Sequence, residues 1–275
     1  SMYTEYQPSH LLVPYIDNYW EFKGNPDYGM RIHILPDGCT DFIFTLGEVA
    51  NAVEEGSLMM QPYRSYFVGP MTKYSELVTY TESIHMFGVR FLPCGLSCFT
   101  NLPLHEFVNS RVSTNEMKAV FDDTFIEKIG EQKHVTDRIR VVEEYLLAYL
   151  ARHYQPADSH VAMAVNMINH SKGKRSVRSL MDDVCLCQRH FERKFKHYTG
   201  FTPKEYSRIV KFKNAVELLR TTTSANLLTT AVDAGYYDLA HFSKEIKSMS
   251  GNTPASFLSL TVPEETTLTY IEPQR

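Results

Sequence analysis

The chain has 275 residues, of which 43% are hydrophobic, 12% aromatic and 22% charged, and its formal net charge is −4. These values are typical of a folded protein with a substantial core and exclude a disordered chain; no apolar run reaches the roughly 18–20 residues of a membrane-spanning helix. Five cysteines, an odd number, do not suit a disulfide framework, so we expect a cytoplasmic location, and the length favours two domains.

Charge is divided unevenly along the chain. Residues 1–154 carry a net charge of −8, residues 155–258 carry +6 and residues 259–275 carry −2. A basic segment can attract a polyanion such as DNA, although +6 is equally typical of a domain that is merely soluble. The charge alone therefore does not distinguish a nucleic-acid-binding segment from an ordinary one.

The first segment, residues 2–113, shows the alternation of apolar and polar side chains that is typical of β-strands. The run IHMFGVRF, which begins at Ile84, is a clear example. Pro36-Asp37-Gly38 has the composition of a tight turn, and we expect it to join the flanking strands as a β-hairpin.

From residue 114 the periodicity becomes helical. Five apolar residues recur at the spacing of one helix face, on a helix expected to end near Tyr154: Val141, Val142, Tyr145, Leu146 and Tyr149. A linker follows at residues 155–158. We expect residues 114–154 to form a helical segment between the two halves of the chain.

Residues 155–258 contain short helices that occur twice in the same order. In each copy a short helix and a turn precede a second helix, at 187–196 and at 239–249. A long helix, which begins with the capping box Thr202-Pro203-Lys204-Glu205, joins the two copies. Two helix–turn–helix units are typical of a protein that places each second helix in the major groove of DNA. The tail, residues 259–275, has no helical pattern and is expected to be irregular.

Four motifs in this region carry a family resemblance. They are RKFKHYTGFTPKEY from residue 193, AVDAGY from 231, HFSK from 241 and GNTPASF from 251. Together they resemble the double helix–turn–helix domain of the AraC/XylS transcription regulators. In the first half, ILPDGCTD from residue 34, VGPMT from 68 and GVRFLP from 88 resemble a cupin-like β-barrel that accompanies this domain.

The resemblance implies a two-domain α+β fold. Residues 2–113 are expected to form a cupin-like β-barrel effector domain, 114–154 a helical dimerisation segment, 155–258 an all-α AraC-type DNA-binding domain and 259–275 a C-terminal extension. The implied function is sequence-specific regulation of transcription, controlled by a small-molecule effector in the barrel. The implied partners are double-stranded promoter DNA, the effector, RNA polymerase and a second copy of the chain; no enzymatic activity, cofactor or membrane association is expected.

The resemblance places the DNA-contacting side chains on the second helix of each unit. Arginine can form two hydrogen bonds to guanine and glutamate can accept one from cytosine, so the first of these helices is suited to reading bases. The alternative is a solvated helix face with an ion pair between Glu192 and Lys196. The second helix departs from the family pattern, because Leu239 and Ala240 stand where polar residues are usual; Leu239 either contacts a thymine methyl group or is incidental. The expected DNA-binding residues are Arg189, His190, Glu192, Arg193, Lys196, Leu239, His241 and Lys244.

The effector is expected to contact aromatic and basic residues of the barrel. The candidates are His33, Phe42, Phe44, His85, Phe87 and Arg90. A metal-binding cupin would need a His-x-His motif, and the chain has Arg31-Ile32-His33 instead, so no metal site is expected.

Two other functions remain open. One is a thiol-sensing regulator without an organic ligand, which would use Cys94 and Cys98 or Cys185 and Cys187. Neither spacing is that of a zinc site, and an unpaired cysteine is commonly a small buried hydrophobic residue. The other is a metal-binding or enzymatic cupin with an attached helical module, which metal analysis of the purified protein would distinguish.

Overall fold

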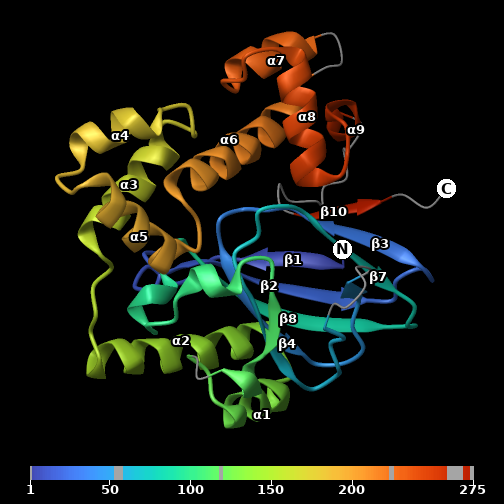
Figure 1. Ribbon diagram of the computed structural model, residues 1–275. Coiled ribbons are helices and arrows are strands. Elements are labelled where there is room, and N and C mark those ends of the chain that lie inside the picture. The colour runs from blue at the N-terminus through green and yellow to red at the C-terminus, as the bar shows by residue number, and fades with distance from the viewer. Residues whose placement is uncertain (1, 53–57, 118–119, 223–225, 259–268, 273–275) are drawn as a thin grey trace.

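The computed structural model describes residues 2–52, 58–117, 120–222, 226–258 and 269–272. Within these residues an N-terminal β-rich domain is followed by a C-terminal helical domain that lies against it (Figure 1). The predicted α+β two-domain fold is therefore confirmed. Among the described residues, no helix combines the length and the apolarity that a membrane crossing requires.

Two antiparallel sheets make up the described part of the N-terminal domain. The first has the strand order β1 (Tyr3–Tyr6), β2 (Ile16–Gly24), β8 (Ile84–Phe91), β4 (Thr40–Thr45), β6 (Ser65–Val68) and β9 (Arg111–Ser113). The second has the order β10 (Thr269–Glu272), β3 (Met30–Ile34), β7 (Ser75–Thr79) and β5 (Asn51–Ala52). Buried side chains of both sheets, such as Trp20, Ile32, Leu77 and Met86, form one core between them. The sheets do not close on each other, but their arrangement is compatible with a cupin-like barrel.

Helices cover the outer face of the six-stranded sheet. These are α1 (Asp123–Glu131) and α2 (Val135–Arg152), and Figure 1 shows both beneath the strands. Phe44 of β4 packs against Phe125 of α1, with ring centroids 5.8 Å apart, and Val142 and Leu146 of α2 are buried in the same core. Three short 3-10 helices complete the domain: η1 (Leu96–Cys98), η2 (Leu104–Phe107) and η3 (Thr114–Glu116).

The C-terminal domain has the predicted pair of helix–turn–helix units. Its helices are α3 (Ser159–His170), α4 (Val177–Asp183), α5 (Gln188–Thr199), α6 (Pro203–Arg220), α7 (Leu227–Asp233), α8 (Leu239–Ser250) and α9 (Pro254–Leu258). The capping box of Thr202 and Glu205 opens α6, which joins the units. The helical core also includes Leu35 and Cys94 of the N-terminal domain, so the two domains share a hydrophobic contact.

Two predictions about local structure are wrong. Strands β3 and β4, on either side of Pro36-Asp37-Gly38, belong to different sheets; β3 pairs with β7 and β10, and β4 pairs with β6 and β8. The turn residues specify a change of direction but not a pairing partner, so the turn leads from one sheet to the other. In the tail that was expected to be irregular, β10 pairs antiparallel with β3; residues 259–268 and 273–275 lie outside the described part of the chain.

Candidate DNA-binding surface and effector pocket

We call α5 and α8, the second helices of the two helix–turn–helix units, the reading helices. In α5, Phe191 and Phe195 lie four residues apart and are fully buried in the helical core. This spacing places both rings on one face of the helix and leaves the other face to solvent. Gly200 ends α5 with a φ of +85°, a left-handed conformation that glycine adopts without strain.

The outer face of α5 presents cationic groups. Arg189, Arg193 and Lys196 are exposed, and within the described residues none of them forms a salt bridge. Glu192 accepts a hydrogen bond from Nε2 of Gln188 at 3.1 Å instead of pairing with Lys196. His190 is half-buried, and its Nδ1 lies 3.2 Å from Nη2 of Arg193. The three cationic groups of this face are therefore available to phosphates or base edges.

In α8, Phe242 and Ile246 are the fully buried pair. The carboxylate of Asp238 caps the helix by accepting a hydrogen bond from the backbone N–H of His241 at 2.7 Å. Glu245 accepts two hydrogen bonds from Arg208 of α6, at 2.8 and 3.0 Å, and so fixes α8 to the connecting helix. The predicted contact residues of this helix are all exposed: Leu239, His241 and Lys244.

One exposed aromatic residue beside α8 was missed by the sequence analysis. The side chain of Tyr237 is 91% exposed, whereas its neighbour Tyr236 is only 4% exposed and packs on Phe242. The family motif ends at Tyr236, and nothing in two adjacent tyrosines indicates which of them faces solvent. A ring at the start of a reading helix is suited to apolar contact with a thymine methyl group.

The N-terminal domain contains a pocket between its two sheets. It has about 570 Å³ of space free of protein atoms, part of it open to solvent. Its wall is largely apolar, and its polar groups come from Asp41, Arg90 and Arg111. The lining residues are Tyr3, Trp20, Phe22, Ile32, Ile34, Asp41, Ile43, Val68, Met71, Leu77, Met86, Arg90 and Arg111.

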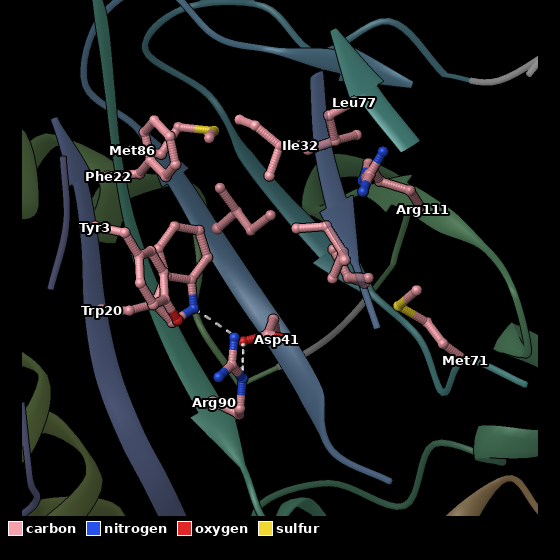
Figure 2. Close-up of a pocket in the computed structure, with 13 residues that line it drawn as sticks. Tyr3, Trp20, Phe22, Ile32, Asp41, Met71, Leu77, Met86, Arg90 and Arg111 are labelled. Atoms are coloured by element: carbon pink, nitrogen blue, oxygen red, sulfur yellow. Dashed lines mark hydrogen bonds and ion pairs between the residues drawn. The ribbon is translucent and has the colours of Figure 1, made fainter. Parts of the chain in front are cut away.

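A buried cluster of charges forms one end of this pocket. Figure 2 shows Asp41 between Trp20 and Arg90: its Oδ1 accepts hydrogen bonds from Nε1 of Trp20 at 3.0 Å and from Nε of Arg90 at 3.1 Å. Oδ2 of Asp37 lies 3.5 Å from Nε of Arg90, and Oε2 of Glu5 lies 3.7 Å from its Nη1. Three carboxylates thus surround a single guanidinium that is only 5% exposed.

Burial and charge act on these groups in opposite senses. Burial raises the pKa of Asp41, although the guanidinium of Arg90 partly opposes this rise. Burial is the largest single influence on Arg90 and disfavours its charged form, but Asp41, Tyr3 and Asp37 together outweigh it and the pKa of Arg90 is raised. Burial also raises the pKa of Tyr3 to about 12. With three carboxylates and the Tyr3 phenol around one guanidinium, the cluster holds more acidic than basic groups.

Of the predicted effector-contacting residues, only Arg90 lines this pocket. Phe42, Phe44 and Phe87 lie on the opposite face of the six-stranded sheet, where they pack with the core that α1 and α2 cover. Both faces of this sheet are buried, so the alternation along β4 did not indicate which residues face the pocket; Asp41 and Ile43 do.

The two predicted histidines also lie outside the pocket wall. Nε2 of His85 is 3.0 Å from Oε2 of Glu21, which also accepts a hydrogen bond from Arg138 of α2 at 3.0 Å. The hydrogen bond from His85 lowers the pKa of Glu21. The ring of His33 stacks on Tyr74, with centroids 5.8 Å apart and planes inclined by 11°.

The cysteines fall into two groups. Cys39, Cys94 and Cys98 are buried, and burial raises the pKa of each thiol, in the case of Cys94 to about 12. A raised pKa lowers the thiolate fraction and with it the reactivity towards oxidants. Cys185 and Cys187 are exposed beside the turn before α5. In the described part of the chain, no three His, Cys, Asp or Glu residues are grouped closely enough to hold a metal ion.

Two family models match separate parts of the chain, one in each domain. Residues 4–113 match a family described as a domain of unknown function (DUF6597), and residues 180–259 match a family described as a helix-turn-helix domain. No curated protein matches the chain at the level of sequence.

Solved structures with the same two-domain fold include ToxT from Vibrio cholerae. A 1.65 Å structure of ToxT has a TM-score of 0.51 and 9% identity, with 87% of this chain and 97% of that chain covered. ToxT of V. cholerae O395 bound to (E)-4-(8-methylnaphthalen-1-yl)but-3-enoic acid has a TM-score of 0.50 and 9% identity, with 87% and 98% covered. An apo ToxT variant from V. cholerae strain SCE256 has a TM-score of 0.51 and 10% identity, with 89% and 98% covered. These likenesses establish the fold, and the C-terminal family match establishes the domain type. The chain therefore contains a C-terminal helix–turn–helix domain, within a two-domain fold that it shares with ToxT.

Proposed function

We propose that this regulator binds promoter DNA through both reading helices and that a small molecule in the N-terminal pocket controls the binding. The observation that carries the proposal is the outer face of α5, where Arg189, Arg193 and Lys196 are exposed without a salt bridge in the described residues. Cationic groups on a helix that projects from a packed core are suited to phosphates and to guanine edges. Contacts with RNA polymerase and pairing of two copies remain predictions from the family resemblance.

The pocket supports an effector with an apolar body. Most of its lining is aromatic or aliphatic, which suits the apolar part of a small organic molecule. Because three carboxylates surround Arg90, the polar end of the pocket favours a hydrogen-bond donor or a cationic group over another carboxylate. Arg111 lies on a different side of the pocket from Asp41 (Figure 2), so we expect an acceptor group of the effector to face Arg111.

The ligand of the ToxT structure is an aromatic carboxylic acid. By analogy of fold we propose that this chain also binds a small organic molecule, in the pocket between its two sheets. The acidic cluster at one end of its pocket predicts a different preference for the polar group of the ligand.

The DNA-binding proposal is tested by selection of duplexes from a random library with the full chain. We expect one sequence to be enriched, and its log affinity to fall with log salt at a slope of about −0.9 per phosphate contact. The variant Arg189→Ala/Arg193→Ala is expected to lose the enrichment. The matched control is Arg64→Ala, an exposed arginine of the N-terminal domain, which is expected to select the same sequence. Absence of any enrichment, or an affinity independent of salt, would contradict the proposal.

A further inference from the structure

One loop of the N-terminal domain touches the ends of both reading helices. It comprises residues 69–74 between β6 and β7, and we call it the strap. The ring of Pro70 lies against Gly200 at the end of α5: a Cβ atom added at Gly200 would be 2.4 Å from Cγ of Pro70. The ring of Tyr74 lies against Gly251 at the end of α8, where an added Cβ would be 2.7 Å from Cζ of Tyr74. Neither position has room for a side chain.

The middle of the strap lines the effector pocket. Met71 is part of the pocket wall and packs against the core between the two sheets, and Figure 2 shows it at the rim of the pocket. Within five consecutive residues the strap therefore contacts α5 through Pro70, the pocket through Met71 and α8 through Tyr74.

Hydrogen bonds from a single residue hold the strap in its conformation. The backbone N–H of Asn109 donates to the carbonyl of Pro70 at 2.7 Å, and Oδ1 of Asn109 accepts from the backbone N–H of Thr72 at 2.9 Å. Nδ2 of Asn109 donates to Oγ1 of Thr72 at 2.8 Å. The strap is thus fixed to Asn109 on both sides of Met71, at Pro70 and at Thr72.

Tyr74 is also connected to the pocket from the other sheet. Its ring stacks on His33, and the neighbours of His33 on β3, Ile32 and Ile34, line the pocket. The ring of Tyr74 thus lies between a strand of the pocket wall and the end of α8.

We propose that the strap couples occupancy of the pocket to the relative position of the two reading helices. This proposal rests on the proposed effector function and adds the segment that links the pocket to the ends of α5 and α8. An effector that displaces Met71 shifts Pro70 and Tyr74 together, and with them the ends of α5 and α8. Since two helices must fit two segments of DNA at once, a small change in their separation changes the affinity for DNA. The effector shifts this equilibrium only because it binds the two strap positions with different affinity.

The test compares two methionines of the same pocket. Met71→Ala removes the strap's side chain from the pocket, and Met86→Ala removes the same side chain from β8, which is not part of the strap. The readout is hydrogen exchange of the full chain at the amides of Gly200 and Gly251, which donate to Lys196 and Lys247 at the helix ends, each at 2.9 Å. We expect about tenfold faster exchange at both amides in Met71→Ala and no change in Met86→Ala.

A second pair of variants perturbs the strap without altering the pocket. Asn109→Ala removes two of the hydrogen bonds to the strap, and Asn115→Ala, an exposed asparagine nearby, is its control. We expect Asn109→Ala to speed exchange at both helix ends and Asn115→Ala to have no effect. If Met71→Ala proves unstable, Met71→Leu keeps the volume of the side chain and is expected to give a smaller change of the same kind.

The outcomes separate this inference from the proposed function. Unchanged exchange in Met71→Ala and Asn109→Ala, or a change at only one of the two helix ends, would overturn the role of the strap. Exchange does not require DNA or an effector, so it tests the strap even if the selection experiment fails. Conversely, enrichment of a duplex by the full chain together with unchanged exchange would support the DNA-binding function and contradict the coupling role of the strap.

Discussion

At the scale of single residues, the surroundings of Arg90 set the charge at one end of the pocket. Carboxylates from β1, from the turn after β3 and from β4 converge on its guanidinium, which leaves the surrounding carboxylates in excess. This excess of negative charge opposes a further carboxylate from a ligand. In the proposed function, the selectivity of the pocket therefore depends on Asp41 as much as on Arg90.

This balance predicts a preference among ligands that share one ring system. We expect 1-naphthylmethylamine and 1-naphthalenemethanol to bind about tenfold more tightly than 1-naphthoic acid, because only the acid places a like charge near Asp41. The measurement is isothermal titration calorimetry on the full chain. The same comparison in Asp41→Asn is expected to show a smaller preference. Tighter binding of the acid in the native chain would contradict the assignment.

At the scale of secondary-structure elements, the two reading helices have the same pattern of buried residues and the same terminal glycine, but different exposed side chains. Each has a buried aromatic residue followed four positions later by a second buried residue, and each ends at a left-handed glycine. The outer face of α5 has two arginines, whereas that of α8 begins with Leu239 and Ala240. Lys244 is a flexible point charge, suited to phosphates more than to the planar edge of a base.

We therefore expect sequence preference to be concentrated in the half-site that α5 contacts. Arg193→Ala is expected to cost about 1–3 kcal/mol on the selected duplex and to relax preference at one base pair. Lys244→Ala is expected to weaken binding equally on all duplexes. The measurement is fluorescence anisotropy with a duplex in which every position is varied in turn at fixed salt. Two half-sites that are equally intolerant of substitution would show instead that α8 also reads bases or DNA shape.

Helices that begin and end with local capping signals could be predicted from the sequence. Which face of a strand lines the pocket, and which distant segments contact each other, could not. The capping box at Thr202 and the terminal glycines indicated the helices of the C-terminal domain, because caps depend on a few neighbouring residues. The choice between Phe42 and Ile43 as a pocket residue depended on what covers each face of the sheet. The strap contacts could not be predicted, because Tyr74 and Gly251 are distant in sequence and no local pattern indicates that they meet.

At the scale of the whole molecule, the two domains are not consecutive segments. Strand β10 lies beyond the helical domain in sequence and pairs with β3 of the N-terminal sheet, as Figure 1 shows. The pairing Ile271–Ile32 lies next to a strand of the pocket wall. A boundary drawn at residue 154 therefore separates β3 from one of its two partners.

A chain that ends at residue 268 is expected to be less stable than one that ends at residue 272. Loss of β10 leaves one edge of β3 without its backbone partner, and an open edge invites association with other chains. We expect the melting temperature to fall by several degrees, at about 2–4 °C for each kcal/mol lost, and light scattering on heating to rise. The chain ending at residue 272 is the control, since it retains β10. Equal melting of the two chains would show that β10 adds no stability.

The pairing of β10 with β3 also imposes an order on biosynthesis. β3 leaves the ribosome before both helix–turn–helix units, whereas its partner β10 follows some 235 residues later, after them. At about 5–20 residues per second, the edge of β3 waits for tens of seconds while the rest of the chain is made. During that interval the N-terminal sheet can fold only in its incomplete form, and a nascent chain on a neighbouring ribosome has access to the same edge. The N-terminal sheet is thus completed only after β10 has emerged, although most of its strands are synthesised first.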